Sequence, residues 1–152
     1  MSAARAPPTE QEIQEDLVRL DAYRSQLNTL AQLHQILVAS RQDHARARES
    51  LDGVDRADAA SEYLLPLGGE TYVRGSIARA APVLLGIGSG IVVEMNRAEV
   101  VELLAKRTER IEGAVRDLEG QIGSLEERIE LLSRRIEAAS RSAGAPGDVG
   151  GA

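Results

Sequence analysis

The C-terminal part of the chain repeats apolar residues at intervals that alternate between three and four positions. The repeat lasts for five heptads within residues 98–141, and ten of its eleven positions are apolar. A 3.5-residue repeat sustained over this length predicts a helix in a left-handed coiled coil. Gly113, Gly120 and Gly123 lie inside it and act either as bending points or as neutral changes. The repeat consists of Val101, Leu104, Thr108, Ile111, Val115, Leu118, Ile122, Leu125, Ile129, Leu132 and Ile136.

Residues 9–52 carry a similar but less regular helical pattern. Thr9 followed three positions later by Glu12 is typical of a capping box at a helix start. We expect the helix to end at Asp52-Gly53. The apolar positions are Ile13, Leu17, Leu20, Tyr23, Leu27, Leu30, Leu37 and Leu51, and the polar residues that interrupt the later seam are His34, Arg41, His44 and Arg48.

Between the helices, residues 62–95 change to a period of two, which is typical of strands. Gly68-Gly69 separates one pair of apolar runs, and Gly88-Ser89-Gly90 separates a second pair. Tight glycine turns between apolar runs predict two β-hairpins. Pro66 fits an edge strand better than a central one, because proline cannot donate to a ladder.

Two helices of similar length on either side of a compact insert predict that the chain returns along itself. Each helix has about 43 residues and therefore spans roughly 65 Å. β-branched residues in one row and leucine in the other also suit parallel two-stranded coils, so the pattern alone leaves that alternative open. We expect an α+β fold: a long antiparallel coiled-coil helical hairpin with two β-hairpins inserted. Residues 1–8 and 142–152 are expected to be disordered.

The insert is too small to be stable alone, since about 34 residues without Phe or Trp bury little core. Its last two strands are apolar on both faces, and four short strands leave open edges. Both problems disappear if several chains close a β-barrel together. We therefore expect obligate assembly through residues 62–95, with contacts from Leu65, Leu67, Val73, Ile77, Val83, Leu85, Ile87, Ile91 and Val93.

Charge and composition exclude several classes of function. The 24 acidic residues outnumber the 18 basic ones, and only three tyrosines supply aromatic rings. Both features argue against nucleic-acid binding. Cysteine is absent, which excludes disulfides and thiol chemistry. We expect a cytoplasmic protein, because the sequence shows neither a signal peptide nor a run of about 20 apolar residues.

The candidate chemical motifs are weak. Gly86-Ile87-Gly88-Ser89-Gly90 lacks the spacing of a dinucleotide or phosphate loop and lies between two strands. His34 and His44 stand ten residues apart without a third ligand. Glu126-Glu127 are adjacent on a helix and point in different directions. We expect no catalytic residues, no cofactor and no metal.

The middle of the chain is similar to the alpha subunits of the prefoldin family. The segments that carry the resemblance are EYLLPLGGETYVRGSI (62–77) and VLLGIGSGIVVEMNRAEVVELLAKR (83–107). They contain the family pattern as Pro66-Leu67-Gly68, Tyr72-Val73-Arg74-Gly75, Gly86-Ile87-Gly88-Ser89-Gly90 and Val93-Glu94.

This resemblance implies a hexamer of two alpha-type and four beta-type prefoldin subunits, whose hairpins form a double β-barrel from which six coiled coils project. It also implies an ATP-independent chaperone, or holdase. Such a chaperone captures unfolded polypeptides at the coiled-coil tips and transfers them to a group II chaperonin.

The tips would comprise roughly residues 10–24 and 125–140. Leu17, Val18 and Leu20 cannot all face one narrow seam, so some of this apolar surface is available to clients; the alternative is that these residues complete the seam. The acidic residues Glu10, Glu12, Glu15 and Asp16 either dock a basic chaperonin patch or form a solvated face. The client-binding candidates are Ile13, Leu17, Val18, Leu20, Leu131, Leu132 and Ile136.

Two other functions remain open. One is a tethering coiled-coil homodimer without chaperone activity, in which the β insert is a dimerisation cap. The other is a nucleic-acid accessory spacer, against which the net charge of −6 counts.

Overall fold

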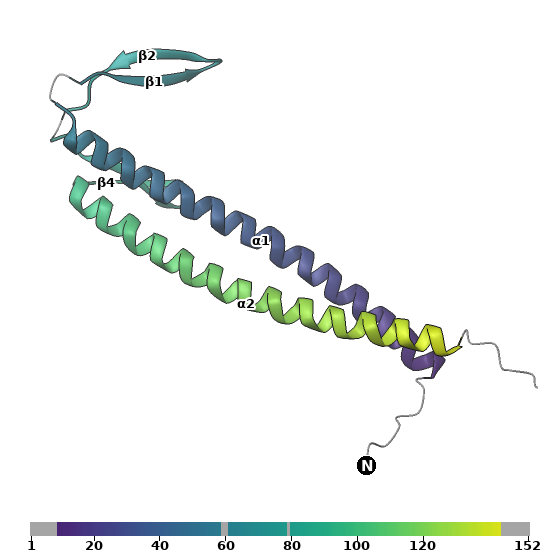
Figure 1. Ribbon diagram of the computed structural model, residues 1–152. Helices are drawn as coiled ribbons and strands as arrows, with labels where there is room; N and C mark the ends of the chain where they lie inside the picture. Colours follow the sequence, from purple (N-terminus) through teal and green to yellow (C-terminus); the bar gives the residue numbers. More distant parts are fainter. Residues whose placement is uncertain (1–8, 59–60, 79, 144–152) are drawn as a thin grey trace, which may run out of the picture. The chain divides into compact units, whose positions relative to one another are not determined.

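The protein is described by a computed structural model that covers residues 9–58, 61–78 and 80–143. Along the chain, one long helix precedes two β-hairpins and a second long helix follows them, as predicted (Figure 1). The elements are α1 (Glu10–Arg56), β1 (Tyr63–Gly68), β2 (Thr71–Gly75), β3 (Val83–Gly88), β4 (Ile91–Met95) and α2 (Arg97–Ala143).

The segments expected to be disordered fall almost entirely outside the described residues. These are residues 1–8 and, of the expected tail 142–152, residues 144–152. Ser142 and Ala143 were placed in the tail, yet they belong to the last turn of α2. Ser142 Oγ donates a hydrogen bond to the carbonyl oxygen of Ala139 at 2.8 Å, which helps to extend the helix.

Helix α1 starts as predicted and ends later than predicted. The Thr9 backbone N–H donates to Glu12 Oε2 at 2.8 Å, and the Glu12 N–H donates to Thr9 Oγ1 at 3.3 Å, which forms a capping box. The predicted stop at Asp52-Gly53 is wrong, because α1 continues to Arg56. A single glycine costs a helix only about 1 kcal/mol. The Gly53 carbonyl accepts a 3.0 Å bond from the Ala57 N–H, so the helical pattern runs through it.

Each hairpin is a separate two-stranded antiparallel sheet. β1 pairs with β2 and β3 pairs with β4, and the registers place Leu65 opposite Val73 and Leu85 opposite Val93. In a two-stranded sheet every strand is an edge strand, which agrees with the expectation for Pro66. The residues with positive φ at the two turns are Gly68, Gly69, Glu70, Gly88, Ser89 and Gly90.

The chain divides into two compact units. The terminal unit combines Met1–Ile36 with Val115–Ala152, and the hairpin unit is Leu37–Ala114. The terminal unit therefore contains the first part of α1 and the last part of α2. The hairpin unit contains the remaining helical segments and both hairpins.

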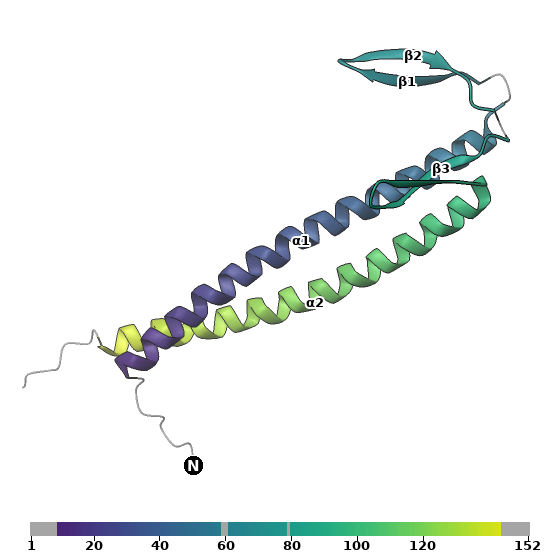
Figure 2. The same cartoon turned by 180° about the vertical axis from the view of Figure 1, so that it is seen from behind.

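Two side-chain contacts between the helices show that α1 and α2 are antiparallel. In the terminal unit Arg135 Nε lies 3.1 Å from Asp16 Oδ2, and His34 Nε2 lies 3.0 Å from Glu119 Oε1. The partner number falls on α2 as the number rises on α1, as an antiparallel pair requires. Figures 1 and 2 show the two helices side by side in this unit. The parallel alternative is thereby ruled out within the chain.

The seam of the terminal unit agrees with the prediction for α2 and differs from it for α1. Val115, Leu118 and Leu125 are buried, as their heptad positions require. On α1, Asp16 is buried at the position that the sequence analysis gave to Leu17. Strict three-four spacing from Ile13 leads to residues 16 and 20, which leaves Leu17 beside the seam.

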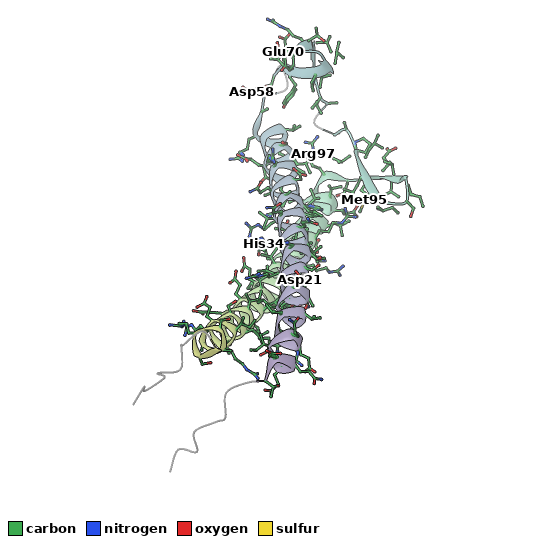
Figure 3. The ribbon with its side chains drawn as sticks, turned by 90° about the vertical axis from the view of Figure 1, so that its right-hand side faces the viewer. Asp21, His34, Asp58, Glu70, Met95 and Arg97 are labelled. Atoms are coloured by element: carbon green, nitrogen blue, oxygen red, sulfur yellow. The ribbon has the colours of Figure 1, made fainter. Side chains whose placement is uncertain are left out.

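The hairpin unit buries Val100 and Leu104 of α2. Val101 was predicted to lie in the seam, but it is only half-buried, and the neighbouring Val100 is buried instead. In the same unit, α1 continues the three-four spacing through Arg41, His44 and Arg48, which are all half-buried. The Nε atom of Arg48 is enclosed and has no hydrogen-bond partner among the described residues. This part of the seam is therefore more polar than the rest. An ion pair between Arg97, which is labelled in Figure 3, and Asp55 joins the two helices there.

Candidate functional site

Apolar side chains of the hairpins are largely open to solvent. Leu67 of β1 is 69% exposed and Leu84 of β3 is 71% exposed. Of the nine predicted assembly residues, Leu65, Leu67, Val73, Ile77, Ile87 and Ile91 are exposed, and Val83, Leu85 and Val93 are half-buried.

Part of this exposed surface lies outside the predicted assembly residues. Leu64, Leu84 and Val92 are exposed as well, and they alternate along their strands with those residues. The sequence already indicates this wider surface, because residues on both faces of the last two strands are apolar. The selection favoured one face, whereas the structure exposes apolar groups on both.

Exposure of the hairpin surface to solvent is energetically unfavourable. A two-stranded hairpin is marginally stable by itself, and among the described residues each of its strands has one edge without a neighbouring strand. Exposed apolar side chains beside open edges favour pairing with further strands. The geometry therefore provides an interaction surface rather than a reaction site.

The predicted client-binding residues separate into three groups in the terminal unit. Leu17, Val18 and Leu131 are 41%, 71% and 67% exposed. Leu20 is only 6% exposed and packs in the seam, so the alternative of seam packing holds for it. The half-buried members of the set are Ile13, Leu132 and Ile136.

The acidic start of α1 also divides. Asp16 is buried against Arg135 and Glu12 takes part in the capping box, so neither presents a free carboxylate. Glu10 and Glu15 are exposed. A docking role for the acidic start of α1 can therefore rest only on Glu10 and Glu15.

The remaining candidate groups have structural roles. Gly88 and Gly90 form the β3–β4 turn together with Ser89. His34 (Figure 3) contacts Glu119, and His44 Nδ1 donates to the carbonyl oxygen of Ser40 at 2.7 Å. Among the described residues, no three His, Asp or Glu side chains are grouped so that they could hold a metal ion.

The carboxyl group of Glu102 has a lowered pKa, and its cause is a neighbouring lysine. The side chain of Lys106 donates a hydrogen bond to Glu102 one turn earlier on α2, and this bond together with its positive charge lowers the pKa of Glu102 below the usual 4.5. Both side chains are exposed, so the pair stabilises the helix surface and does not resemble an acid–base pair in a pocket. Within residues 9–58, 61–78 and 80–143, no helix is long and apolar enough to cross a membrane.

Comparisons with known proteins by sequence agree on one family. The sequence pattern of the family described as "Prefoldin subunit" matches residues 23–142. The prefoldin subunit alpha of Methanopyrus kandleri is 30% identical over 109 residues, which is 69% of each chain. That of Archaeoglobus fulgidus is 27% identical over 104 residues, which is 68% of this chain and 76% of the relative.

Solved structures share the fold at lower identity. A chain in the cryo-EM structure of filamentous PFD from Methanocaldococcus jannaschii has a TM-score of 0.65 and 20% identity, and the match covers 80% of this chain and 98% of that one. The crystal structure of the prefoldin beta subunit from Thermococcus strain KS-1 has a TM-score of 0.56 and 19% identity, with coverage of 89% and 96%. The family match spans most of both helices and both hairpins, so this chain belongs to the prefoldin family, whose members are chaperone subunits and not enzymes.

Proposed function

We propose that this chain is the alpha-type subunit of an ATP-independent holdase. In this proposal it assembles with beta-type prefoldin subunits, captures unfolded polypeptides, and transfers them to a group II chaperonin in the cytoplasm. One observation carries the proposal: apolar side chains are exposed in two separate regions, on both hairpins and near the free ends of the helices.

The hairpins supply the assembly surface. They expose apolar groups from all four strands and leave strand edges unpaired. Adding strands from neighbouring subunits would cover the side chains and complete the hydrogen-bond ladders at once. The similarity to prefoldin alpha subunits from two archaea supports the alpha-type assignment. A hexamer with two alpha-type and four beta-type chains is part of the proposal.

The terminal unit supplies the capture surface. Val18 and Leu131 are large, exposed and far in sequence from the hairpins. Scattered apolar side chains on a stable helix pair offer weak contacts that do not depend on a partner's exact sequence. Such contacts suit unfolded polypeptides, which expose apolar segments of many kinds.

Release to a chaperonin requires a second recognition element. The exposed carboxylates of Glu10 and Glu15 lie in the first two turns of α1, beside the proposed capture surface. They would attract a basic patch on the chaperonin, and this attraction would weaken as salt increases.

The native mass of the chain, alone and mixed with a beta-type subunit, tests the proposal first. A two-plus-four hexamer that keeps guanidinium-unfolded lysozyme from aggregating without ATP would support it. A homodimer that ignores the beta-type subunit and leaves aggregation unchanged would favour a tethering coiled coil instead.

A further inference from the structure

A long stretch of α1 carries no formal charge. Residues 25–40 contain no Asp, Glu, Lys or Arg, although these residues make up 28% of the chain. Sixteen residues of average composition would contain four or five of them. Charged side chains are the usual covering of an exposed helix face, so their absence here needs a physical reason.

One face of this stretch is both uncharged and exposed. The seam takes Leu27, Leu30 and His34, which are half-buried. Away from the seam, Leu33 is 44% exposed and Ile36 is 64% exposed. Gaps of three or four residues connect them to Val18 at the start of the helix, which places them on one helix face. We call this face the exposed stripe of α1; it consists of Val18, Ala22, Ser25, Thr29, Leu33 and Ile36, all exposed.

The stripe offers few polar groups to a partner. Thr29 Oγ1 donates a hydrogen bond to the carbonyl oxygen of Ser25 at 3.2 Å, so its hydroxyl proton is already used within the helix. From residue 18 to residue 36 the stripe is roughly 27 Å long at 1.5 Å per residue. An extended polypeptide of about eight residues covers that length.

The area of the stripe argues against a permanent helix partner. Its three large side chains can each bury on the order of 100 Å², together far less than the roughly 1,200 Å² of a stable interface. The absence of charge argues against a partner recognised by ion pairs. A weak, elongated surface that repels neither acidic nor basic sequences fits an extended apolar segment of an unfolded polypeptide.

We propose that the client-binding surface continues from the start of α1 along the exposed stripe to Ile36. This inference rests on the proposed holdase function and adds a second contact region, about 27 Å from Val18 along the helix. A client that touches both ends of the stripe gains avidity from individually weak contacts. Loss of one end therefore reduces retention without abolishing it.

The test compares two charge insertions one residue apart. Ile36→Glu places a carboxylate on the stripe, whereas Gln35→Glu places the same charge about 100° around the helix, away from it. Both variants are assembled with beta-type subunits and titrated against guanidinium-unfolded lysozyme in a light-scattering assay. We expect Ile36→Glu to need about fivefold more complex for half-suppression, and Gln35→Glu to match the unmodified complex. A photo-crosslinking residue at position 36 should also label the client more strongly than one at position 35.

The possible outcomes distinguish a failure of this inference from a failure of the proposed holdase function. Suppression by the unmodified complex, with Ile36→Glu equal to Gln35→Glu and equal labelling at both positions, overturns the inference alone. A change in native mass caused by Ile36→Glu also overturns it, because the stripe would then contact another subunit. An unmodified complex that never suppresses aggregation overturns the holdase function, and the inference with it.

Discussion

Asp16 shows how one polar residue can define a helix pair. Its carboxylate is buried in the seam between Ile13 and Leu20, and Arg135 reaches across from α2 to pair with it. A buried charge is weak evidence for stability, but a single polar seam position is a well-attested means of fixing register. The apolar pattern favours the neighbouring Leu17 for this seam position, whereas strict three-four spacing from Ile13 leads to Asp16.

Replacing Asp16 tests this role. Asp16→Ala should lower the free energy of unfolding by about 1–3 kcal/mol, because it leaves the Arg135 guanidinium unpaired; the loss stays at this level since Arg135 is half-exposed. Asp16→Leu should match or exceed the stability of the unmodified protein, because it restores an apolar seam. Urea denaturation followed by circular dichroism measures both.

Asp21→Ala is the matched control, since Asp21 is exposed on the same helix (Figure 3). It should change stability by less than about 0.5 kcal/mol. Equal losses from Asp16→Ala and Asp21→Ala would show that the pair of Asp16 and Arg135 contributes nothing.

The exposed pair of Glu102 and Lys106 makes a second residue-level prediction. Lys106→Gln should raise the pKa of Glu102 towards 4.5, whereas Lys106→Arg should keep it low. A carboxyl whose pKa is lower in the folded state adds stability above its unfolded pKa, and this addition is lost as the pH falls through the folded pKa. Carbon-detected NMR titration of Glu102 gives the value. A pKa unchanged by Lys106→Gln would contradict this assignment of cause.

At the scale of elements, a helix was predicted more accurately when more of its seam positions are apolar. Helix α2 was predicted closely because nearly every seam position is apolar. Helix α1 was predicted less well because its seam accepts polar residues such as His34 and Arg48. The end of α1 was predicted too early, because a glycine weakens a helix without necessarily ending it.

The hairpins were predicted from their glycine turns, and one of these glycines gives an element-level prediction. Gly88 has a φ of +111°, which side chains of L-residues rarely adopt, whereas Gly86 in the same strand has no such constraint. An added Cβ would meet no described atom within 4 Å at either position. Gly88→Ala should therefore destabilise the β3–β4 hairpin by about 1–3 kcal/mol through backbone strain.

Amide hydrogen exchange across β3 and β4 measures this effect. Exchange should become faster in Gly88→Ala and remain unchanged or slower in Gly86→Ala. Similar protection in both variants would mean that the turn does not need its left-handed conformation.

For the whole molecule, the sequence indicated that the insert must assemble but could not select its contact faces. Which face of a strand becomes covered depends on the partner subunit, and the sequence of this chain does not contain that information. The same limit applies to the exposed stripe of α1, which obeys helical spacing yet lies outside the seam. Exposure in the folded chain was needed to find both Leu84 and Ile36.

If the chain assembles through its hairpins, a charge placed on the hairpin surface should lower the native mass of the complex. Ile91→Asp should weaken binding to beta-type subunits at least tenfold, because a carboxylate would enter an apolar interface without a partner. Ser89→Asp adds the same charge at the turn, where aspartate tolerates positive φ, and should assemble normally. Native mass spectrometry of mixtures with a beta-type subunit distinguishes them, and a full hexamer containing Ile91→Asp would refute the assignment of this surface.

Capture at the other unit should be separable from assembly. Val18→Glu combined with Leu131→Glu places charges on two highly exposed positions of the terminal unit, so the hexamer should keep its mass and thermal stability. The amount of complex needed to suppress lysozyme aggregation should rise several-fold, because unfolded segments would have to desolvate two carboxylates. Ile91→Asp should lose both mass and suppression, whereas this pair should lose suppression alone. A pair variant with unchanged suppression would move client binding away from the free ends of the helices, because its assembly would be intact.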